Sequence, residues 1–339
     1  MRAVTIIDIA KQAGVSVSTV SRVINDSKKV SDSLRQRVCE VIEKNNFRPN
    51  SIAQGLVTKT THIVGIVLPD ISNPVFYTLI KGIDAVLSQY EYTFILCESQ
   101  GKSSKEAELL QLLRDRKIDG IIFAGVTVDE KLIATMNDIH IPIVLVCQDP
   151  ERLDCGFDVV NIDNIKLAYD ATQFLIQSGH ERIAMLSGPL YDLGSGRKRF
   201  EGYCKALEDA NIPFYENYVK FGPFLFEDGV RGMKQIFEEN RKLPTAVLAA
   251  SDLMAIGAID FLISNGVEVP EQISVMGMTD IPMSAIYRPA LTTMKFDAYE
   301  VGNTASHILM EILNGNGSSP AYHEIDFKLI RRNSVKIKV

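Results

Sequence analysis

From residue 62 almost to the end of the 339-residue chain, short apolar runs alternate with amphipathic helical patterns. The apolar runs predict strands at 63–68, 93–97, 120–124, 143–146, 183–186, 246–250 and 274–277. Helical patterns fill intervals at 76–89, 105–116, 165–177, 199–210 and 253–265. This alternation predicts an α/β body with parallel sheets covered on both faces. Because the stretch is too long for one such sheet, we expect two lobes, with a ligand site between them at the carboxyl ends of the strands.

The first 47 residues have a different pattern, which predicts three short helices. Thr5 and Asp8 form a capping-box pattern, Gly14 breaks the first helix, and Ser16 and Ser31 stand at the N-cap positions of the second and third. A small shared core is predicted from Ile6, Ile9, Ala10, Val20, Val23, Val38 and Ile42. We therefore expect a separate all-α head in front of the α/β body.

Charge is distributed unevenly between the head and the body. The whole chain has a formal net charge of −6, but residues 1–59 contain ten Lys and Arg against five Asp and Glu. The rest of the chain is correspondingly acidic, which predicts that only the head contacts a polyanion.

Patterns typical of enzymes and metal proteins are missing from the sequence. The five cysteines (Cys39, Cys97, Cys147, Cys155 and Cys204) form no C-x-x-C pair, and the five histidines are isolated. There is no phosphate-binding loop of the G-x-x-x-x-G-K-[ST] type and no G-x-S-x-G or H-E-x-x-H motif. We expect no catalytic residues, no cofactor, no metal and no disulfide framework, and the first residues do not read as a signal peptide. Together with the lack of a long apolar stretch, this favours a cytoplasmic protein with no membrane contact.

The segment from Thr5 to Asn25 has the pattern of a helix-turn-helix. Ala10 is small enough for the crossing of the two helices, Gly14 permits a positive φ in the turn, and Val20 anchors the second helix. The second helix can then enter the major groove with its N-terminal side chains at base edges.

This segment resembles the DNA-binding head of the lactose-repressor (LacI/GalR) family of bacterial transcription regulators. The resemblance continues along the chain in FRPNSIAQGL (47–56), PDISNPVFY (69–77), KIDG (117–120), GHERI (179–183) and PALTT (289–293). It implies a helix-turn-helix head at 1–49, a hinge helix at 50–60 and an effector-binding and dimerisation domain at 61–339 that resembles periplasmic binding proteins. The implied N-lobe spans 61–161 and 292–323, and the C-lobe spans 162–291 and 324–339.

The resemblance also implies roles for residues of the head and hinge. Base contacts fall on Val17, Ser18 and Arg22, and phosphate contacts on Thr5, Ser16, Thr19, Ser21, Asn25 and Ser31. Residues 50–58 make a poor helix alone, because they include Gly55 and three β-branched side chains. In the family such a segment folds on DNA and inserts a leucine into the minor groove, which implies hinge contacts from Asn50, Ala53, Gln54 and Leu56.

In the body, the resemblance implies an effector pocket. Its residues would be Asp70, Ser72, Asn73, Phe76, Gln148, Arg199, Phe224, Ser251, Asp252 and Asp280. An arginine suits hydroxyls or a carboxylate, and an aromatic face suits a sugar or a base. Relatives often have an aspartate where this chain has Cys147 and a carboxylate or amide where it has Thr279, so the pocket is expected to be less acidic than in many sugar-binding members. The effector is expected to be a sugar or sugar derivative without further definition.

The sequence leaves some alternatives open. An enzyme or a secreted sugar-binding protein fits the body alone but leaves the basic head without a purpose. Within the family, the chain also resembles catabolite control proteins and ribose repressor-like members. The former use a phosphorylated carrier protein, HPr, as corepressor. The main prediction is a homodimer that binds a pseudo-palindromic operator under the control of a small effector, and the C-terminal segment has no heptad repeat that would join dimers into a tetramer.

Overall fold

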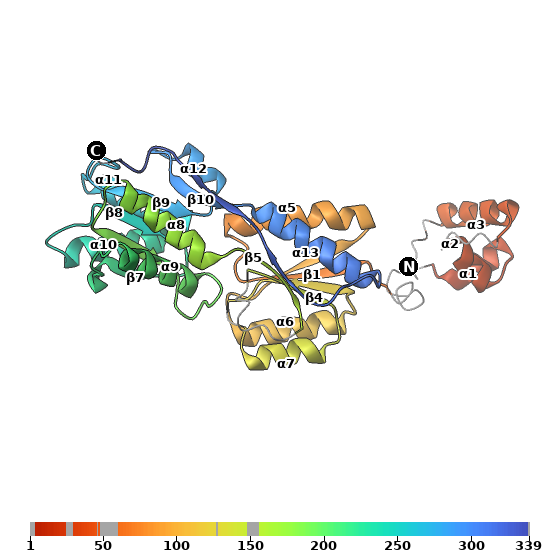
Figure 1. Ribbon diagram of the computed structural model, residues 1–339. Helices are drawn as coiled ribbons and strands as arrows, with labels where there is room; N and C mark the ends of the chain where they lie inside the picture. Colours follow the sequence, from red (N-terminus) through yellow and green to blue (C-terminus); the bar gives the residue numbers. More distant parts are fainter. Residues whose placement is uncertain are drawn as a thin grey trace. The chain divides into compact units, whose positions relative to one another are not determined.

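The computed structural model describes residues 4–24, 30–45, 47, 60–126, 128–147 and 156–337 (Figure 1). The chain divides into two compact units, Met1–Thr61 and His62–Val339. The predicted site residues that lie outside the described part are Asn25, Asn50, Ala53, Gln54, Leu56 and Gln148.

The described residues of the smaller unit form three helices, α1 (Ile6–Ala13), α2 (Val17–Ile24) and α3 (Asp32–Lys44), as the sequence predicts. The predicted capping box is confirmed. The backbone N–H of Thr5 donates to Asp8 Oδ2 at 2.9 Å, and that of Asp8 donates to Thr5 Oγ1 at 3.4 Å. Gly14 ends α1 with a φ of 66°, a left-handed conformation that glycine adopts at little cost.

The core of this unit also agrees with the prediction from periodicity. The predicted core residues Ile9, Ala10, Val20, Val23 and Val38 are buried, Ala13 joins them, and Ile6 and Ile42 pack partly buried against the cluster. The predicted side-chain cap of α3 is wrong. Ser31 occupies the N-cap position, but its hydroxyl makes no capping bond and instead lies 3.4 Å from the hydroxyl of Ser33.

The described part of the larger unit contains two six-stranded sheets, and we call each sheet with its covering helices a lobe. The sheet of the first lobe has the order β11-β5-β4-β3-β1-β2, and all of its pairs are parallel. Its strands are β1 (Ile63–Leu68), β2 (Thr93–Glu98), β3 (Gly120–Phe123), β4 (Ile143–Val146), β5 (Asp158–Asn161) and β11 (Tyr322–Glu324).

The sheet of the second lobe has the order β12-β10-β9-β8-β6-β7, with β12 antiparallel at one edge. Its strands are β6 (Ile183–Ser187), β7 (Val219–Phe221), β8 (Ala246–Ala249), β9 (Ser274–Met278), β10 (Thr292–Phe296) and β12 (Phe327–Ile330). Strands β5, β7, β10 and β11 have no predicted counterpart, and each has three to five residues.

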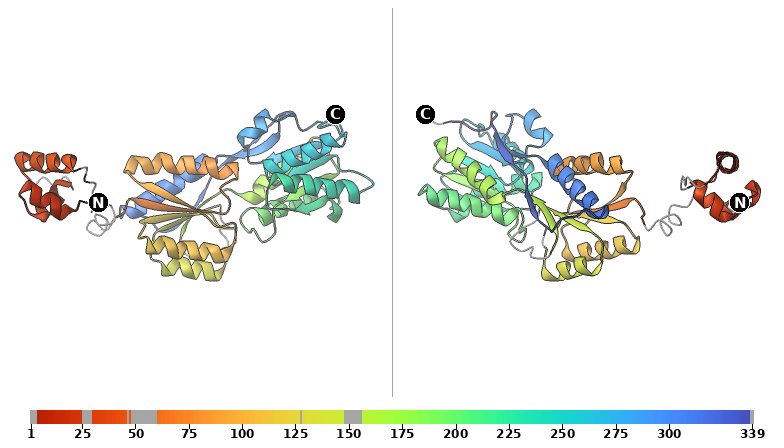
Figure 2. Two further views of the ribbon diagram at one scale, coloured as in Figure 1. Left: turned by 180° about the vertical axis from the view of Figure 1, so that it is seen from behind. Right: turned by 45° about the vertical axis from the view of Figure 1, so that its right-hand side comes forward.

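Helices cover both faces of each sheet, as the alternation in the sequence predicts (Figure 2). In the first lobe, α5 (Pro74–Leu87) and α13 (Ala298–Leu313) pack side by side on one face, and α6 (Ser103–Asp115) and α7 (Glu130–Asp138) cover the other. In the second lobe, α8 (Asn164–Gln177) and α9 (Gly196–Asp209) lie opposite α10 (Phe226–Glu239) and α11 (Asp252–Ser264). Successive residues of each strand enter different cores. For example, Met185 packs toward α8 and α9, whereas Leu186 packs toward α10 and α11.

The chain passes between the lobes after β5, after β10 and after β11 (Figures 1 and 2). The predicted lobe boundary at residue 292 is therefore wrong. Strand β10 pairs in parallel with β9 and antiparallel with β12, so it belongs to the second lobe. The passage comes directly after Phe296, where Asp297 caps α13. Hydrogen bonding to β9, a long-range interaction, decided the lobe to which these residues belong.

The close packing of α5 against α13 yields a test of the fold. A Cβ atom at Gly82 would lie 2.0 Å from the carbonyl oxygen of Tyr299 in α13, and backbone cannot move aside as a flexible side chain can. We expect Gly82→Ala to lower the free energy of unfolding by about 1–3 kcal/mol, measured by urea denaturation. Asp84→Ala, at an exposed position of the same helix, should change it by no more than about 0.5 kcal/mol. Equal effects of the two substitutions would contradict the packing described.

Candidate functional site

The second helix of the smaller unit presents one apolar face and one exposed face. Val20 and Val23 are buried in the core of the head, which turns Ser18 and Arg22 outward. Val17, at the start of the helix, is 41% exposed although its side chain is apolar. The three predicted base-contacting residues are therefore all accessible on α2, with Val17 and Ser18 at its N-terminus and Arg22 in its last turn.

Hydroxyl groups gather at the start of this helix. Ser16 caps it, since its Oγ accepts from the backbone N–H of Thr19 at 3.2 Å. The same Oγ lies 2.8 Å from Ser18 Oγ and 2.9 Å from Thr19 Oγ1. Ser31 is exposed, whereas Thr5, Thr19 and Ser21 are partly exposed. The free N–H groups of a helix start together with such hydroxyls suit the binding of phosphate oxygens.

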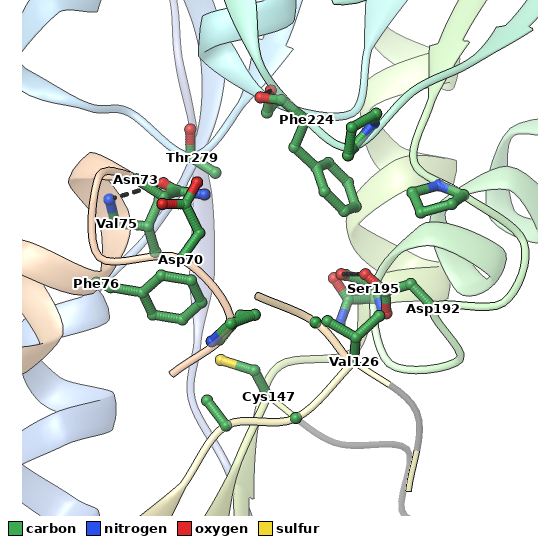
Figure 3. A pocket seen from close by; sticks show the side chains of 18 of the residues that line it. Asp70, Asn73, Val75, Phe76, Val126, Cys147, Asp192, Ser195, Phe224 and Thr279 are labelled. Atoms are coloured by element: carbon green, nitrogen blue, oxygen red, sulfur yellow. Dashed lines mark hydrogen bonds between the residues drawn. The ribbon is translucent and has the colours of Figure 1, made fainter. Parts of the chain in front are cut away.

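In the larger unit, a cavity of about 370 Å³ lies between the lobes. It is lined by residues that follow strands of both sheets, and Figure 3 shows their side chains pointing into a common space. The opposed carboxyl ends of the two sheets form this site, as the topology predicts. Of the predicted effector residues, six line it: Asp70, Asn73, Phe76, Arg199, Phe224 and Ser251.

Two phenyl rings reach into the cavity from different lobes. Phe76 comes from α5 and Phe224 from the segment before α10 (Figure 3). Phe224 has a φ of 69°, an uncommon conformation for a bulky residue, and strain of this kind tends to occur at functional sites. The ring packs over Gly188, where a Cβ atom would lie 2.2 Å from Phe224 Cζ. The main chain and Gly188 together direct this ring into the cavity.

On the side of the second lobe, a buried guanidinium group forms part of the wall. Arg199 is only 5% exposed, and its Nε donates to Asn164 Oδ1 at 2.8 Å while its Nη1 donates to the carbonyl oxygen of Ala250 at 2.5 Å. Burial lowers the pKa of this guanidinium. Asp192 compensates part of its charge and is itself buried, which raises the pKa of the Asp192 carboxyl.

Asp192 also shapes the loop that precedes α9. Its Oδ1 accepts from the backbone N–H groups of Gly194 and Ser195, at 3.1 and 3.0 Å, and its Oδ2 accepts from Ser195 Oγ at 2.7 Å. Asn164 Nδ2 donates to the carbonyl oxygen of Gly194 at 2.8 Å. Asn164 thus joins this loop to Arg199, and none of the three lining residues Asn164, Asp192 and Ser195 was predicted from the sequence.

The wall of the first lobe is polar and partly exposed. Asp70 Oδ1 accepts from the backbone N–H and the hydroxyl of Ser72, at 2.8 and 2.7 Å. Asn73 caps α5 by accepting from the backbone N–H of Val75 at 3.1 Å. Glu98, at the end of β2, also lines the cavity and accepts from the backbone N–H of Ile71 at 3.4 Å. Glu98 was not predicted, although the sequence holds a signal for it, because a polar residue directly follows the predicted strand 93–97 there.

Three predicted effector residues lie outside the cavity lining, and their contact with an effector stays a prediction. Ser72 is exposed and donates to Asp70. Asp252 is fully buried and accepts from Thr293 Oγ1 at 2.6 Å, from the backbone N–H of Ile281 at 3.1 Å and from Ser284 Oγ. Asp280 pairs with Arg332 at 2.6 Å and with Lys295 at 3.5 Å. In each case protein groups in the second lobe or in the adjacent turn take the interactions that a ligand would have made.

Behind the wall of the first lobe, a second carboxyl group is completely enclosed. Glu106 of α6 is 0% exposed, and its Oε1 accepts from Ser99 Oγ at 3.2 Å, next to the lining residues Gln100 and Gly101. Its Oε2 has no hydrogen-bond partner within the described part of the chain. Burial raises the pKa of this carboxyl to about 7.

Neither a metal centre nor a membrane span is found in the described part of the structure. No three His, Cys, Asp or Glu residues among those described converge as metal ligands do. Of the described helices, none combines the length and the hydrophobicity that a span requires.

The raised pKa of Glu106 yields a prediction of how stability depends on pH. Between the ordinary pKa of a glutamate and about 7, the folded protein holds a proton that the unfolded chain has lost, so raising the pH through this window lowers the free energy of unfolding. Glutamine does not titrate, so Glu106→Gln should not lose this stability as the pH rises. Between about pH 5 and pH 8 we expect the free energy of unfolding of the variant to increase relative to that of the wild type by at most about 3 kcal/mol, measured by urea denaturation. For the exposed control Glu108→Gln, the free energy of unfolding should depend on pH as it does in the wild type. A constant difference between Glu106→Gln and the wild type across this range would refute the prediction.

Two family models match the chain. Residues 5–50 match the family described as bacterial regulatory proteins, lacI family, and residues 61–333 match the family described as periplasmic binding proteins and sugar binding domain of LacI family. Both matches coincide with the helical head and the two-lobed body.

Similar proteins and structures span the whole chain. Catabolite control protein A of Priestia megaterium is 34% identical over 98% of this chain and 99% of the relative. The HTH-type transcriptional repressor PurR of Histophilus somni is 32% identical over 98% of this chain and 99% of the relative. The structure of the lac repressor dimer bound to operator and the anti-inducer ONPF superimposes with a TM-score of 0.89 at 26% identity, covering 99% of this chain and 100% of that one. The chain belongs to the LacI family, and it is a DNA-binding transcription regulator with an effector-binding domain.

Proposed function

We propose that this chain is a repressor that binds a pseudo-palindromic operator as a homodimer, and that a sugar or sugar derivative controls its operator affinity. The observation that carries the proposal is the cavity lined by both lobes, because a ligand that contacts both lobes favours one angle between them over another. A ligand of this kind shifts operator affinity by about 1–3 kcal/mol in ordinary cases.

In this proposal, α2 reads the operator. Its accessible side chains Val17, Ser18 and Arg22 contact base edges, with Arg22 donating to a guanine and Val17 packing against a thymine methyl group. Phosphate contacts come from the hydroxyl groups at the helix starts, among which Ser16 and Thr19 already lie together. The hinge segment 50–60, with Leu56 as the minor-groove wedge, enters the proposal from the sequence alone.

A hydrogen bond between a cavity residue and a strand that leads from one lobe to the other supports the proposed control of operator affinity. Thr279 lines the cavity, and its backbone N–H donates to Thr293 Oγ1 in β10 at 3.2 Å. Strand β10 leads directly into α13 of the first lobe. A ligand that moves the loop at Thr279 therefore acts on a segment that joins the lobes. The proposal covers both signs of control, release from the operator and stronger binding to it.

The proposed partners and location follow the family. The homodimer is supported by the lac repressor, whose solved structure is described as a dimer bound to operator. We place the protein in the cytoplasm, where a bacterial operator is accessible, and assign it no catalytic activity.

A second candidate function replaces the free effector with a protein partner. It rests on the 34% identity to a catabolite control protein, together with the segment 69–73 that carries this resemblance. In this alternative, phosphorylated HPr docks on the body as corepressor and the cavity modulates its action.

The DNA-reading role of Arg22 can be tested on an operator selected from random sequences. We expect Arg22→Ala to weaken binding to the selected operator by about 1–3 kcal/mol and to relax the preference at one base pair, measured by fluorescence anisotropy. Arg37→Ala, at an exposed position of α3, removes the same charge and should weaken binding to the selected operator and to random DNA by similar factors. If both variants behave alike, Arg22 contributes charge and no sequence discrimination.

The proposed control by a small molecule can be tested by thermal unfolding with sugars, sugar phosphates, purines and phosphorylated HPr. A ligand at a hundredfold excess over its Kd adds about 2.7 kcal/mol to the free energy of unfolding, which raises the midpoint visibly. We expect a small-molecule hit that is lost in Phe224→Ala and that alters operator affinity. A shift with phosphorylated HPr alone would favour the alternative, and a hit that survives Phe224→Ala would place the effector outside this cavity.

A further inference from the structure

The charged residues that line the cavity are unequally distributed. Among the described lining residues there are three carboxylates, from Asp70, Glu98 and Asp192, and a single cationic side chain, that of Arg199. The cavity is therefore acidic before any ligand enters it, and the position of each charge determines which ligand it favours.

The positive charge of Arg199 is already compensated by the protein. Two of its nitrogens donate to Asn164 and to the carbonyl oxygen of Ala250, and Asp192 acts on it electrostatically. A guanidinium held in this way has one nitrogen, Nη2, without an acceptor in the described part of the chain. It can donate to one hydroxyl of a ligand, but it offers no unopposed charge to a phosphate or a carboxylate.

The two carboxylates of the first lobe are in the opposite situation. Asp70 and Glu98 both anchor the turn that follows β1, since Asp70 accepts from Ser72 and Glu98 accepts from the backbone N–H of Ile71. All of these bonds use one oxygen of each carboxylate, Asp70 Oδ1 and Glu98 Oε1. Neither residue forms an ion pair with a described cation, so the second oxygen of each is available on the same wall of the cavity.

Closing a cleft over such carboxylates is costly unless the ligand compensates their charge. Removing an unpaired carboxylate from water is among the most unfavourable steps in binding, whereas a protonated amine placed against it forms a charge-assisted hydrogen bond. An anionic ligand adds repulsion instead. The first-lobe wall thus favours a cationic group, and it opposes phosphate esters.

The remainder of the cavity limits the body of the ligand. The rings of Phe76 and Phe224 enter from the two lobes and offer apolar faces, which suits the C–H surface of a sugar ring (Figure 3). Asn73, Ser195 and Ser251 add neutral polar groups on both sides, and these suit hydroxyls. A volume of about 370 Å³ accommodates one or two such rings.

We propose that the effector is a hydroxylated ring that carries a protonated amine, that Asp70 and Glu98 bind this amine, and that Arg199 Nη2 binds a hydroxyl at the opposite side. This inference rests on the proposed function, since it names the ligand class of the same cavity. Asp70 and Glu98 are then specificity-determining residues that select amines and reject phosphorylated sugars.

The test uses matched ligands on the full-length protein. Glucosamine, galactosamine and mannosamine are compared, in buffer that keeps their amines protonated, with the parent hexoses, the N-acetylated forms and the hexose 6-phosphates. We expect at least one amino sugar to raise the unfolding midpoint, and its N-acetylated and phosphorylated counterparts to bind at least about tenfold more weakly in calorimetry. Stronger binding of a neutral hexose or a 6-phosphate than of every amino sugar overturns the proposal, and so does the absence of binding by all three amino sugars.

Isosteric variants test the two carboxylates directly. Asp70→Asn and Glu98→Gln retain the oxygen that accepts from the turn and remove the charge, so the local fold is preserved. Each variant should bind the amino sugar at least about tenfold more weakly than the wild type does, and should bind the N-acetylated form equally well or better. The exposed control Glu108→Gln removes one charge away from the cavity and should leave both affinities unaltered. Equal losses for charged and N-acetylated ligands in the two cavity variants would show a structural role only, and would overturn the assignment.

Operator binding separates this inference from the proposed function. If a neutral sugar binds best and alters operator affinity, the inference fails and the proposed function stands. If an amino sugar binds through Asp70 and Glu98 but leaves operator affinity unchanged, the ligand class is supported and the proposed control of DNA binding fails.

Discussion

The carboxylate of Asp252 holds together the second-lobe segments on which the cavity depends. Its Oδ1 accepts from Thr293 in β10, and its Oδ2 accepts from the backbone of Ile281 and from the hydroxyl of Ser284. Asp252 starts α11, Ile281 caps the short helix α12 (Pro282–Ile286) in which Ser284 lies, and Thr293 lies in the strand that leads into the first lobe. One buried side chain thus connects a helix start, a cavity loop and a passage between the lobes. Burial raises its pKa to about 6, which shows that its hydrogen bonds only partly offset the loss of water.

The first lobe has a related arrangement with a different balance. Glu106 lies behind the loops that carry Gln100 and Gly101, as Asp252 lies behind the loop that carries Thr279. Asp252 engages both of its oxygens, whereas Glu106 leaves Oε2 without a partner in the described part of the chain. A buried carboxyl oxygen without a partner lowers stability.

Family membership and cavity chemistry answer different questions about this protein. The relatives include proteins described as catabolite control protein A and as the repressor PurR, and a similar solved structure is described as a CelR–cellobiose complex. These descriptions differ from one another, so membership alone assigns no effector to this chain. The residues that line the cavity carry that information. In this chain they are the partly exposed carboxylates of the first-lobe wall and the compensated arginine of the second.

The sequence by itself determined the local features. Helix starts, the turn at Gly14, the core of the head and seven of the strands depend on residues close together in the chain, and their periodicity and capping patterns predicted them. The general place of the ligand site also followed, because strands alternating with helices bring their carboxyl ends to one edge.

Only the tertiary structure decided which residues face the cavity. Asp252 and Asp280 follow strands just as Asp70 does, yet Thr293, Ser284 and Arg332 bind them from distant parts of the chain. In the same way, β10 belongs to the second lobe because it pairs with β9. Asp192 lies at the cavity because its carboxylate accepts hydrogen bonds from the loop that carries it. The partners of a polar side chain are set by long-range contacts, and a sequence pattern limited to near neighbours does not contain them.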